Sequence, residues 1–300
     1  MRIAVVTPTY NRSDFLKELY VSLINQNGRE SLSWIVIDDG SNDSTKKIIE
    51  NFKKENLIKI NYIYQKNSGK AAALNLAFNT FKLFDFFLIV DSDDRLMDNV
   101  YSSIETEILK YKDDSNIGAI FFRYMNSTNE ILSSKKDHID KTVIMKRSEH
   151  DSRYGKYDGC VGYYKRVTSK YNYPTFYGEN YLGPTVLQLM MEDEFEIVFS
   201  KKVIGIAEYQ ESGLTNSGRL LRLKNPNGMK VYSFLILKKT NSYTLKIKYA
   251  IYYNMYNYFS RIFSNKRDDV QEKSKYIKIT KPFGYLLYVY YKNKYKELLK

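Results

Sequence analysis

Residues 86–94 read FFLIVDSDD, so five apolar side chains pass directly into an acidic cluster that begins at Asp91. A short run of aromatic and β-branched residues that ends in this way is typical of a buried strand in a parallel sheet. We therefore predict a strand over residues 85–91. The same pattern predicts strands over residues 3–7, 33–38 and 58–64.

Apolar residues recur at helical spacing between these runs, as Phe15, Leu19 and Leu23 do after the first one. This spacing predicts helices over residues 13–26, 43–55 and 69–82. Strands that alternate with helices in this order form a parallel sheet with helices on both faces. The predicted fold class is therefore α/β.

A polar cluster lies at the end of each predicted strand. The clusters are Thr7-Pro8-Thr9-Tyr10-Asn11, Asp38-Asp39-Gly40-Ser41, Asn67-Ser68-Gly69-Lys70 and Asp91-Ser92-Asp93-Asp94. In an open parallel sheet the ligand crevice lies beyond the carboxyl ends of the strands, so we expect the clusters to line one site. Each cluster alone is typical of a turn or a helix cap, but that alternative does not predict four of them at successive strand ends.

The residue types of these clusters suit a nucleoside diphosphate and its metal. Asp91 and Asp93 are two apart in extended chain, so their carboxylates leave the same face and can converge. Such hard oxygen ligands favour Mg²⁺ or Mn²⁺, which take further ligands from water and a substrate diphosphate. Asp38 or Asp39 can accept a hydrogen bond from a base or ribose. The N–H groups and the ammonium of Lys70, at the start of a helix, suit an anion.

Four stretches together resemble family 2 glycosyltransferases of the GT-A fold. They are residues 5–12 (VVTPTYNR), 34–45 (WIVIDDGSNDST), 67–75 (NSGKAAALN) and 90–94 (VDSDD). The resemblance is specific over about residues 1–125, weaker to about 217 and absent beyond. It implies a Rossmann-like, mostly parallel sheet flanked by helices, a UDP-sugar donor, Mn²⁺ or Mg²⁺ as cofactor, and transfer of a hexose in one displacement that inverts the anomeric centre.

The resemblance also implies which residues line the donor site. The nucleotide-sugar contacts are Thr7, Pro8, Tyr10, Asn11, Asp38, Asp39, Asn67, Gly69, Lys70, Asp91 and Ser92. Asp93 ligates the metal as the last residue of the family's Asp-x-Asp motif, and Asp91 contacts the metal or the ribose. A carboxylate is expected to deprotonate the acceptor hydroxyl.

The base implied by the resemblance is Glu179, the first carboxylate of residues 174–180 (PTFYGEN), which resemble the family's segment before its acceptor-side helix. Many relatives carry another acid a few residues later, where this chain has residues 183–185 (GPT). The base is therefore Glu179 or an acid from elsewhere. The other candidates are Asp158, Glu192 and Asp193. The structural alternative for Glu179 is a surface Glu at a helix start, where the helix dipole favours an acid.

The chain of 300 residues carries 47 Lys and Arg against 34 Asp and Glu, a formal net charge of +13. Its single cysteine, Cys160, excludes an internal disulfide, and no His/Cys cluster offers a zinc site. We expect the cytoplasm as its compartment. The first strand starts at once and no apolar stretch reaches about 18 residues, so neither a secretion signal nor a membrane span is expected.

Beyond Arg219, Lys and Arg far outnumber acids and many aromatic residues lie between them. One stripe recurs at helical spacing and predicts an amphipathic helix, with Lys246, Lys248 and Arg261 off the stripe. Its members are Leu245, Tyr249, Tyr252, Tyr256, Phe259 and Phe263. Two interpretations stay open: association with an anionic membrane surface, or a helical subdomain that packs its aromatic residues inside the protein. No nucleic acid is expected as a partner, because no known binding motif accompanies the charge.

The sequence thus predicts a GT-A domain at 1–217 and a basic, Tyr-rich helical extension at 218–300. The first comprises a nucleotide-binding half (1–125) and an acceptor half (126–217). Within the latter, residues 127–151 are expected to form a surface excursion or a flexible loop. Residues 208–215 resemble a family segment that closes over the donor, with an ordinary loop as the alternative.

We expect an inverting transferase that moves a sugar from a UDP-sugar to a glycan or lipid-linked acceptor in bacterial cell-surface polysaccharide synthesis. It would work in the cytoplasm, peripherally on the inner face of the plasma membrane. The alternatives are a non-catalytic membrane-surface or scaffold protein with a vestigial nucleotide site, and a nucleotidyltransferase. The second would favour a Gly-rich phosphate loop after the first strand, which residues 7–11 lack.

Overall fold

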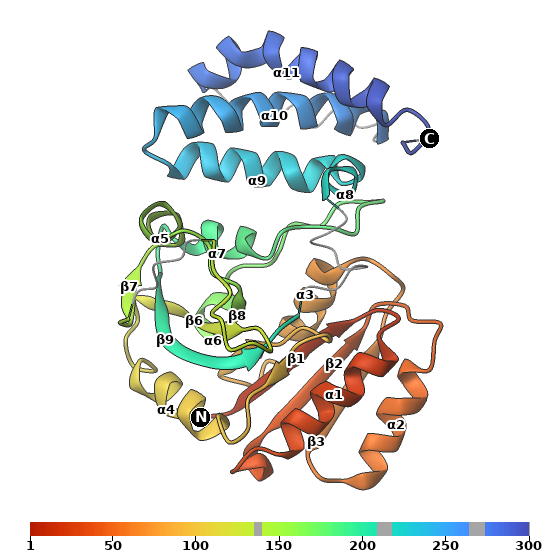
Figure 1. Cartoon of the computed structure of the whole chain (residues 1–300), viewed down its shortest axis with the longest axis vertical. Coiled ribbons are helices and arrows are strands. Elements are labelled where there is room, and N and C mark those ends of the chain that lie inside the picture. Colours follow the sequence, from red (N-terminus) through yellow and green to blue (C-terminus); the bar gives the residue numbers. More distant parts are fainter. Residues whose placement is uncertain (135–139, 209–217, 264–273, 300) are drawn as a thin grey trace. The chain divides into compact units, whose positions relative to one another are not determined.

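A computed structural model describes residues 1–134, 140–208, 218–263 and 274–299. The chain divides into two compact units. The sheet unit comprises Met1–Tyr173 and Met191–Glu208, and the helical unit comprises Pro174–Met190 and Tyr209–Lys300. Figure 1 labels most of the helices and strands of both units.

In the sheet unit, the described residues form nine strands of one sheet, in the order β3-β2-β1-β4-β8-β6-β9-β5, with β7 paired to β9. The strands are β1 (Ile3–Thr9), β2 (Ser33–Asp38), β3 (Lys59–Tyr64), β4 (Phe86–Ile89), β5 (Arg95–Leu96), β6 (Ile117–Met125), β7 (Val143–Met145), β8 (Gly159–Tyr164) and β9 (Glu196–Ile206). The first four predicted strands are present, and β3, β2, β1 and β4 pair in parallel. The α/β fold class is confirmed.

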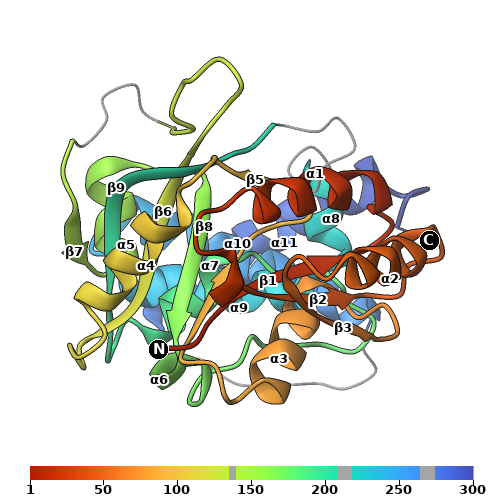
Figure 2. The same cartoon turned by 90° about the horizontal axis from the view of Figure 1, so that it is seen from below.

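Helices cover both faces of this parallel half (Figure 2). They are α1 (Ser13–Ile24), α2 (Thr45–Glu55) and α3 (Lys70–Thr80), as the apolar spacing predicts. α1 and α2 bury Leu19 and Phe52 in one core with Trp34 of β2. On the other face, the ring of Phe78 of α3 packs 5.3 Å from that of Phe87 of β4. The alternation of side chains along each strand supplies both cores.

The second half of the sheet mixes directions: β8 runs antiparallel to β4 and β6, whereas β9 runs parallel to β6. This half carries α4 (Tyr101–Lys110), α5 (Arg147–Tyr154) and α6 (Lys165–Thr168), while the short helix η1 (Arg29–Ser31) lies between β1 and β2 in the first half. Gly162 of β8 is required by packing, because a Cβ there would lie 2.1 Å from Cε1 of Phe86.

The prediction that residues 127–151 form a surface excursion or a flexible loop is wrong for their second part. This part contains β7, which pairs with β9, and the start of α5. Arg147 and His150 are buried there: the imidazole stacks on Phe199 with centroids 3.7 Å apart, and the guanidinium lies over Phe121. Polar side chains buried by stacking on aromatic rings leave no apolar period in the sequence, so the pattern missed them.

The helical unit contains α7 (Thr185–Met191), which ends at the first residue of the returning sheet unit, followed by four further helices among the described residues. These are α8 (Gly218–Lys224), α9 (Pro226–Lys239), α10 (Tyr243–Phe263) and α11 (Lys275–Lys294). α10 packs between α9 and α11 (Figure 1). None of the described helices is both long and apolar enough to cross a bilayer.

The predicted amphipathic helix is α10, and part of its aromatic stripe lies inside the helical unit. Tyr256 and Phe259 are fully buried with Leu223 of α8 and Met229 of α9. For these two residues of the stripe, the burial agrees with the interpretation that the extension is a helical subdomain with its aromatic residues packed inside the protein.

α10 and α11 approach closely around Gly284. A Cβ at this position would lie 2.3 Å from the Cβ of Asn254 on α10. The buried amide of Asn254 donates to the carbonyl of Ile277 (2.9 Å) and to Oγ1 of Thr280 (3.2 Å). Pro282 lies in the same part of α11 and has no N–H to donate to the carbonyl of Lys278.

The predicted division into residues 1–217 and 218–300 stays a prediction. The compact units differ from it in one respect, since residues 174–190 group with the helices of the extension.

We expect Gly284→Ala to destabilise the helical unit by about 1–3 kcal/mol, because the added methyl group must push α10 and α11 apart. Urea unfolding followed by far-ultraviolet circular dichroism reports the helices, while the fluorescence of Trp34, the single tryptophan, reports the sheet unit. Gly183→Ala is the control, because nothing lies within 4 Å of the position that its new Cβ would take. Equal effects of the two substitutions would contradict the close helix contact.

Candidate nucleotide site

The loops that follow β1, β2 and β3 meet at one edge of the sheet. The parallel register sets Thr9 opposite Asp38 and Asp38 opposite Tyr64, so the three strands end together. The predicted convergence of the polar clusters therefore holds for these loops. Asp39 continues the pairing, since its N–H donates to the carbonyl of Thr9 (2.8 Å).

Asp39 is the centre of this edge. Its buried carboxylate accepts hydrogen bonds from Nε2 of Gln65 (2.7 Å), from the N–H of Ser68 (2.8 Å) and from the N–H of Gly69 (2.7 Å). It thereby shapes the loop at residues 67–69, which precedes α3. Charge-assisted hydrogen bonds of this kind are among the stronger ones in proteins. Asp39 is thus a positioning group for the backbone that leads into Lys70.

Asp38 is also buried, and its carboxylate connects the loop after β2 with strand β3. Its Oδ1 accepts from the N–H of Ser41 (2.7 Å) and its Oδ2 accepts from the hydroxyl of Tyr62 (2.7 Å). Burial and this bond to a carboxylate raise the pKa of Tyr62. Gly40, which follows Asp39, has φ 92°. A Cβ at this position would lie 2.7 Å from the backbone N of Asn67 in the loop after β3. The two loops are therefore packed against each other.

The loop after β1 is tied to the loop after β2. The N–H of Asn11 donates to Oγ of Ser41 (2.9 Å), and Oδ1 of Asn11 accepts from the N–H of Asn42 (2.9 Å). Asn11 has φ 50°, a left-handed conformation that asparagine tolerates better than most residues. Tyr10, just before it, is exposed, so its ring is available to a ligand at this edge.

Thr7 is buried beneath the surface of this edge. Its side chain is fully buried, and its hydroxyl accepts a hydrogen bond from Nε1 of Trp34 (2.9 Å). The hydroxyl is therefore used within the fold, where it fixes the Trp34 ring beneath the site. Its expected contact with the nucleotide stays a prediction, as does that of the neighbouring Pro8.

Lys70 begins α3 and reaches Asp91 at the end of β4. Its ammonium contacts both carboxylate oxygens, Oδ1 at 2.6 Å and Oδ2 at 2.5 Å. Burial alone would lower the pKa of Lys70, but the charge of Asp91, with smaller contributions from Asp94 and Asp93, outweighs it and raises the pKa. The ammonium therefore stays charged and lies between the helix start and the acidic cluster.

Asp94 is a member of this cluster that the expected site residues omit. Burial, followed by the charges of Asp91 and Asp93, raises the pKa of Asp94 to about 9, with Lys70 acting in the opposite direction. Asp158 adds to the rise, so its carboxyl also lies within electrostatic reach. The signal for Asp94 was present in the sequence as the third acid of DSDD, which a motif with two acids leaves aside.

The cluster concentrates more carboxyl groups than Lys70 can neutralise, which is a donor set that suits a hard divalent cation. Among the described residues, no three His, Cys, Asp or Glu side chains are arranged as a preformed metal site. Mg²⁺ commonly binds through only one or two carboxylates, with water and substrate phosphates as the other ligands. Asp93 and Asp91 therefore fit the ion that the resemblance implies, and its binding stays a prediction.

The four candidate bases lie in different surroundings. Asp158 precedes β8 and is near the acidic cluster. Glu192 is buried, and its carboxylate accepts from the N–H (3.1 Å) and the hydroxyl (2.9 Å) of Ser148, so it is engaged in the fold. Asp193 is exposed next to it.

Glu179 belongs to the helical unit, where it caps α9. Its Oε1 accepts from the N–H (2.7 Å) and the side-chain amide (2.8 Å) of Asn227, and its Oε2 accepts from the N–H of Gly228 (2.9 Å). Burial raises the pKa of Glu179, and these hydrogen bonds oppose the rise. The residue thus stands at a helix start, that of α9, but it is half-buried and not the surface Glu of the structural alternative; its role as a base stays a prediction.

The segment expected to close over the donor lies largely outside the described residues. Of residues 208–215, Glu208 is described, and its Oε1 accepts from the N–H of Ser127 (2.6 Å).

Known proteins share both the sequence pattern and the fold. The family model described as "Glycosyl transferase family 2" matches residues 4–171. The minor teichoic acid biosynthesis protein GgaA of Bacillus subtilis is 37% identical over 106 residues, which are 34% of this chain and 23% of that protein. A GalNAc(5)-diNAcBac-PP-undecaprenol β-1,3-glucosyltransferase of Campylobacter jejuni is 28% identical over 162 residues, 52% of this chain and 47% of that protein. The matches thus span less than half of these relatives.

Two solved structures show the same fold at low identity. TarS residues 1–349 of S. aureus, in complex with UDP-GlcNAc, superposes with a TM-score of 0.59 at 15% identity, over 95% of this chain and 79% of that one. The mannosyltransferase PcManGT of Pyrobaculum calidifontis, in complex with GDP-Man and Mn²⁺, also gives 0.59, at 14% identity, over 98% and 87%. Because the family model matches more than half of the chain, and the sheet and its loops agree with it, the chain belongs to glycosyltransferase family 2.

Proposed function

We propose that this glycosyltransferase moves a hexose from a UDP-sugar to a glycan or lipid-linked acceptor, with inversion at the anomeric centre, in the synthesis of a bacterial surface polysaccharide. The observation that carries the proposal is the meeting of the strand-end loops with the Lys70–Asp91 pair at one edge of the sheet. UDP and UDP-GlcNAc complexes of a protein with the same fold support the donor. The names of the relatives from B. subtilis and C. jejuni support the acceptor class.

In this proposal the strand-end loops bind the nucleotide. Asp39 holds residues 67–69 so that the start of α3 and its free N–H groups face the diphosphate, where the helix dipole favours an anion. The Lys70 ammonium is fixed beside that position by Asp91. Tyr10 is exposed at the same edge and offers a ring against the uracil. A preorganised set of donors needs no rearrangement as charge develops on the leaving group.

Asp93 and Asp91 would hold Mn²⁺ or Mg²⁺, which when bound offsets the charge that grows on the departing UDP. The arrangement of the chain around them supports this assignment: Asp91 and Asp93 follow the buried end of β4, and the raised pKa of Asp94 reports that both carboxylates lie close to it. Among the described residues, none donates a hydrogen bond to the carboxylate of Asp93, so its oxygens are free to serve as ligands.

The acceptor hydroxyl must lose its proton as it attacks, and we propose Glu179 as the base, with Asp158 as the fallback. A carboxyl group with a raised pKa is a better proton acceptor than an ordinary one, and burial raises the pKa of Glu179. In favour of Asp158 is its place near Asp94 in the sheet unit.

A lipid-linked acceptor would lie at a membrane. We therefore propose that the protein works peripherally at the inner face of the plasma membrane. The names of the relatives, which refer to an undecaprenol-linked glycan and to teichoic acid, support this setting.

We expect Asp93→Ala to abolish Mn²⁺-enhanced binding of UDP, because it removes the proposed metal ligand, and to reduce turnover by about 10²-fold or more. Calorimetric titration with UDP, with and without Mn²⁺, measures this. Asp98→Ala is the matched control, an exposed acid shortly after the cluster. Unchanged binding in the first variant would remove Asp93 as a ligand, and no UDP binding by the wild type would favour the scaffold alternative.

We expect Glu179→Gln to lower kcat by about 10²–10⁴-fold, and the wild-type rate to fall on acidification with a midpoint above the ordinary Glu pKa of 4.5, because a base with a raised pKa is protonated early. Asn227→Ala removes one capping contact but keeps the carboxylate, so it controls for the structural role of Glu179. A normal kcat in Glu179→Gln together with a large loss in Asp158→Asn would assign the base to Asp158.

A further inference from the structure

α11 carries a row of large apolar side chains on its outer face. We call Ile279, Phe283, Leu286 and Tyr290 the outer stripe. Their spacing of four, three and four residues places them on one side of the helix over about 16 Å. Their exposed fractions are 70%, 58%, 64% and 55%, so none of them contributes a buried side chain to the core of the helical unit.

The opposite face of α11 makes the contacts that hold the helix. Ile277, Thr280 and Gly284 are buried there, and the last two pack against Asn254 of α10. The packing of α11 is therefore complete without the outer stripe. An exposed apolar row of this length on a described helix needs a binding partner to account for it.

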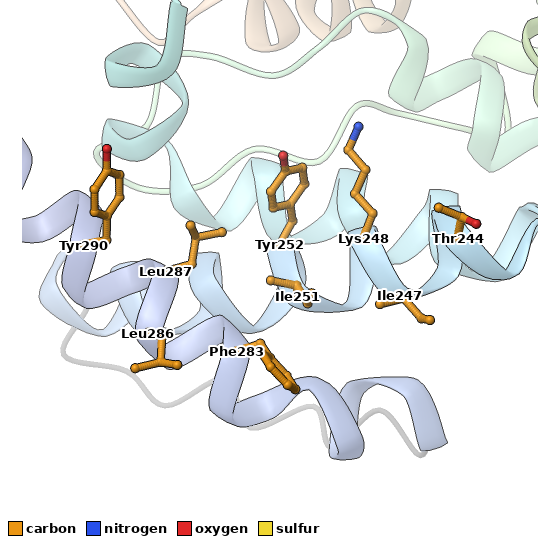
Figure 3. Close-up of a pocket in the computed structure, with 9 residues that line it drawn as sticks. All are labelled: Thr244, Ile247, Lys248, Ile251, Tyr252, Phe283, Leu286, Leu287 and Tyr290. Carbon is orange, nitrogen blue, oxygen red and sulfur yellow. The ribbon is translucent and has the colours of Figure 1, made fainter.

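The outer stripe continues into an apolar groove between α10 and α11, with a volume of about 620 Å³ (Figure 3). Phe283, Leu286 and Tyr290 line the groove from α11, and Ile247 and Ile251 line it from α10. Ile247 is itself 47% exposed, so the apolar surface extends across two helices. Figure 3 shows the side chain of Lys248 beside these residues, and its ammonium extends away from the groove.

The surroundings of this surface are basic throughout. The described helices α8 to α11 contain fourteen Lys and Arg residues and no Asp or Glu. Lys275 lies one helical turn before Ile279 and Lys294 lies one turn after Tyr290, so these two exposed lysines continue the line of the outer stripe at its ends. An apolar row with lysines at its margins matches a surface that has acyl chains below a layer of negative headgroups.

We infer that the outer stripe and the groove beside it form a docking surface for an anionic lipid bilayer, with Ile279, Phe283, Leu286 and Tyr290 entering the interface and Lys275 and Lys294 binding the headgroup phosphates. A second copy of the chain is the weaker match, because two uniformly basic surfaces repel each other. Of the aromatic stripe of α10 that the sequence singled out, Tyr252 lines the groove, whereas Tyr256 and Phe259 are buried inside the helical unit.

This inference rests on the proposed function only in that a membrane-linked acceptor gives the surface a purpose. The test contains neither donor nor acceptor. Full-length protein is sedimented with vesicles of phosphatidylglycerol and phosphatidylcholine in equal parts, and with vesicles of phosphatidylcholine alone. UDP titration of the same samples reports the proposed donor site separately, so either idea can fail while the other stands.

We expect the wild type to bind the phosphatidylglycerol vesicles and to leave the neutral ones. The double variant Phe283→Ser/Leu286→Ser should bind at least about tenfold more weakly. Lys275→Glu/Lys294→Glu should lose about fivefold for each lysine removed, with the loss suppressed at high salt. UDP binding and circular dichroism should be unchanged in both, since these side chains are exposed and remote from the proposed donor residues in the sequence.

The controls are Leu83→Ser, which removes a side chain of the sheet unit with 72% exposure, and Lys46→Glu/Lys47→Glu, which reverses two exposed charges of α2. Both should bind vesicles as the wild type does. Absence of binding to phosphatidylglycerol vesicles would overturn the inference, and so would wild-type binding by the outer-stripe variant. Light scattering is measured in parallel, and a dimer that this variant dissociates, without vesicle binding by the wild type, would assign the surface to self-association.

Discussion

The carboxylate of Asp39 is the contact on which the candidate site depends. Its three hydrogen bonds hold Gln65 and the N–H groups of Ser68 and Gly69, and its own N–H continues the pairing with Thr9. One buried anion thus connects β1, the loop after β2 and the start of α3. A buried carboxylate with this many donors is strongly localised, because losing any donor leaves charge desolvated without compensation. The position of Lys70 follows from that loop.

Charge balance at the end of β4 follows from the same geometry. Lys70 neutralises Asp91. Carboxyl groups that are held close together repel one another, and this repulsion lowers the stability of the folded protein. Such groups commonly belong to functional sites. In the proposed function this site binds a divalent cation and a diphosphate.

The helical unit shows how one sequence pattern can have two outcomes. The stripe of α10 and the outer stripe of α11 are both aromatic and apolar at helical spacing, yet Phe259 is buried and Phe283 is exposed. The difference arises because α10 packs between α9 and α11, whereas α11 has a packing partner on one face, where Gly284 and Asn254 meet. An amphipathic pattern predicts that a helix has an apolar face, and the neighbouring helices determine whether that face is buried.

The sequence by itself determined the α/β class, the parallel strands β1 to β4 with their helices, and the meeting of the polar loops at the carboxyl edge. These follow from local periodicity and from the connection rules of parallel sheets. It did not predict β7 and α5, because Arg147 and His150 are buried by stacking on Phe121 and Phe199 and leave no apolar period. Only the tertiary structure showed that Asp38, Asp39 and Thr7 are engaged within the fold, that Glu179 caps α9, and that Asp158 lies near Asp94. The physical reason is that a polar side chain acquires its role from partners distant in the chain, which no local pattern encodes.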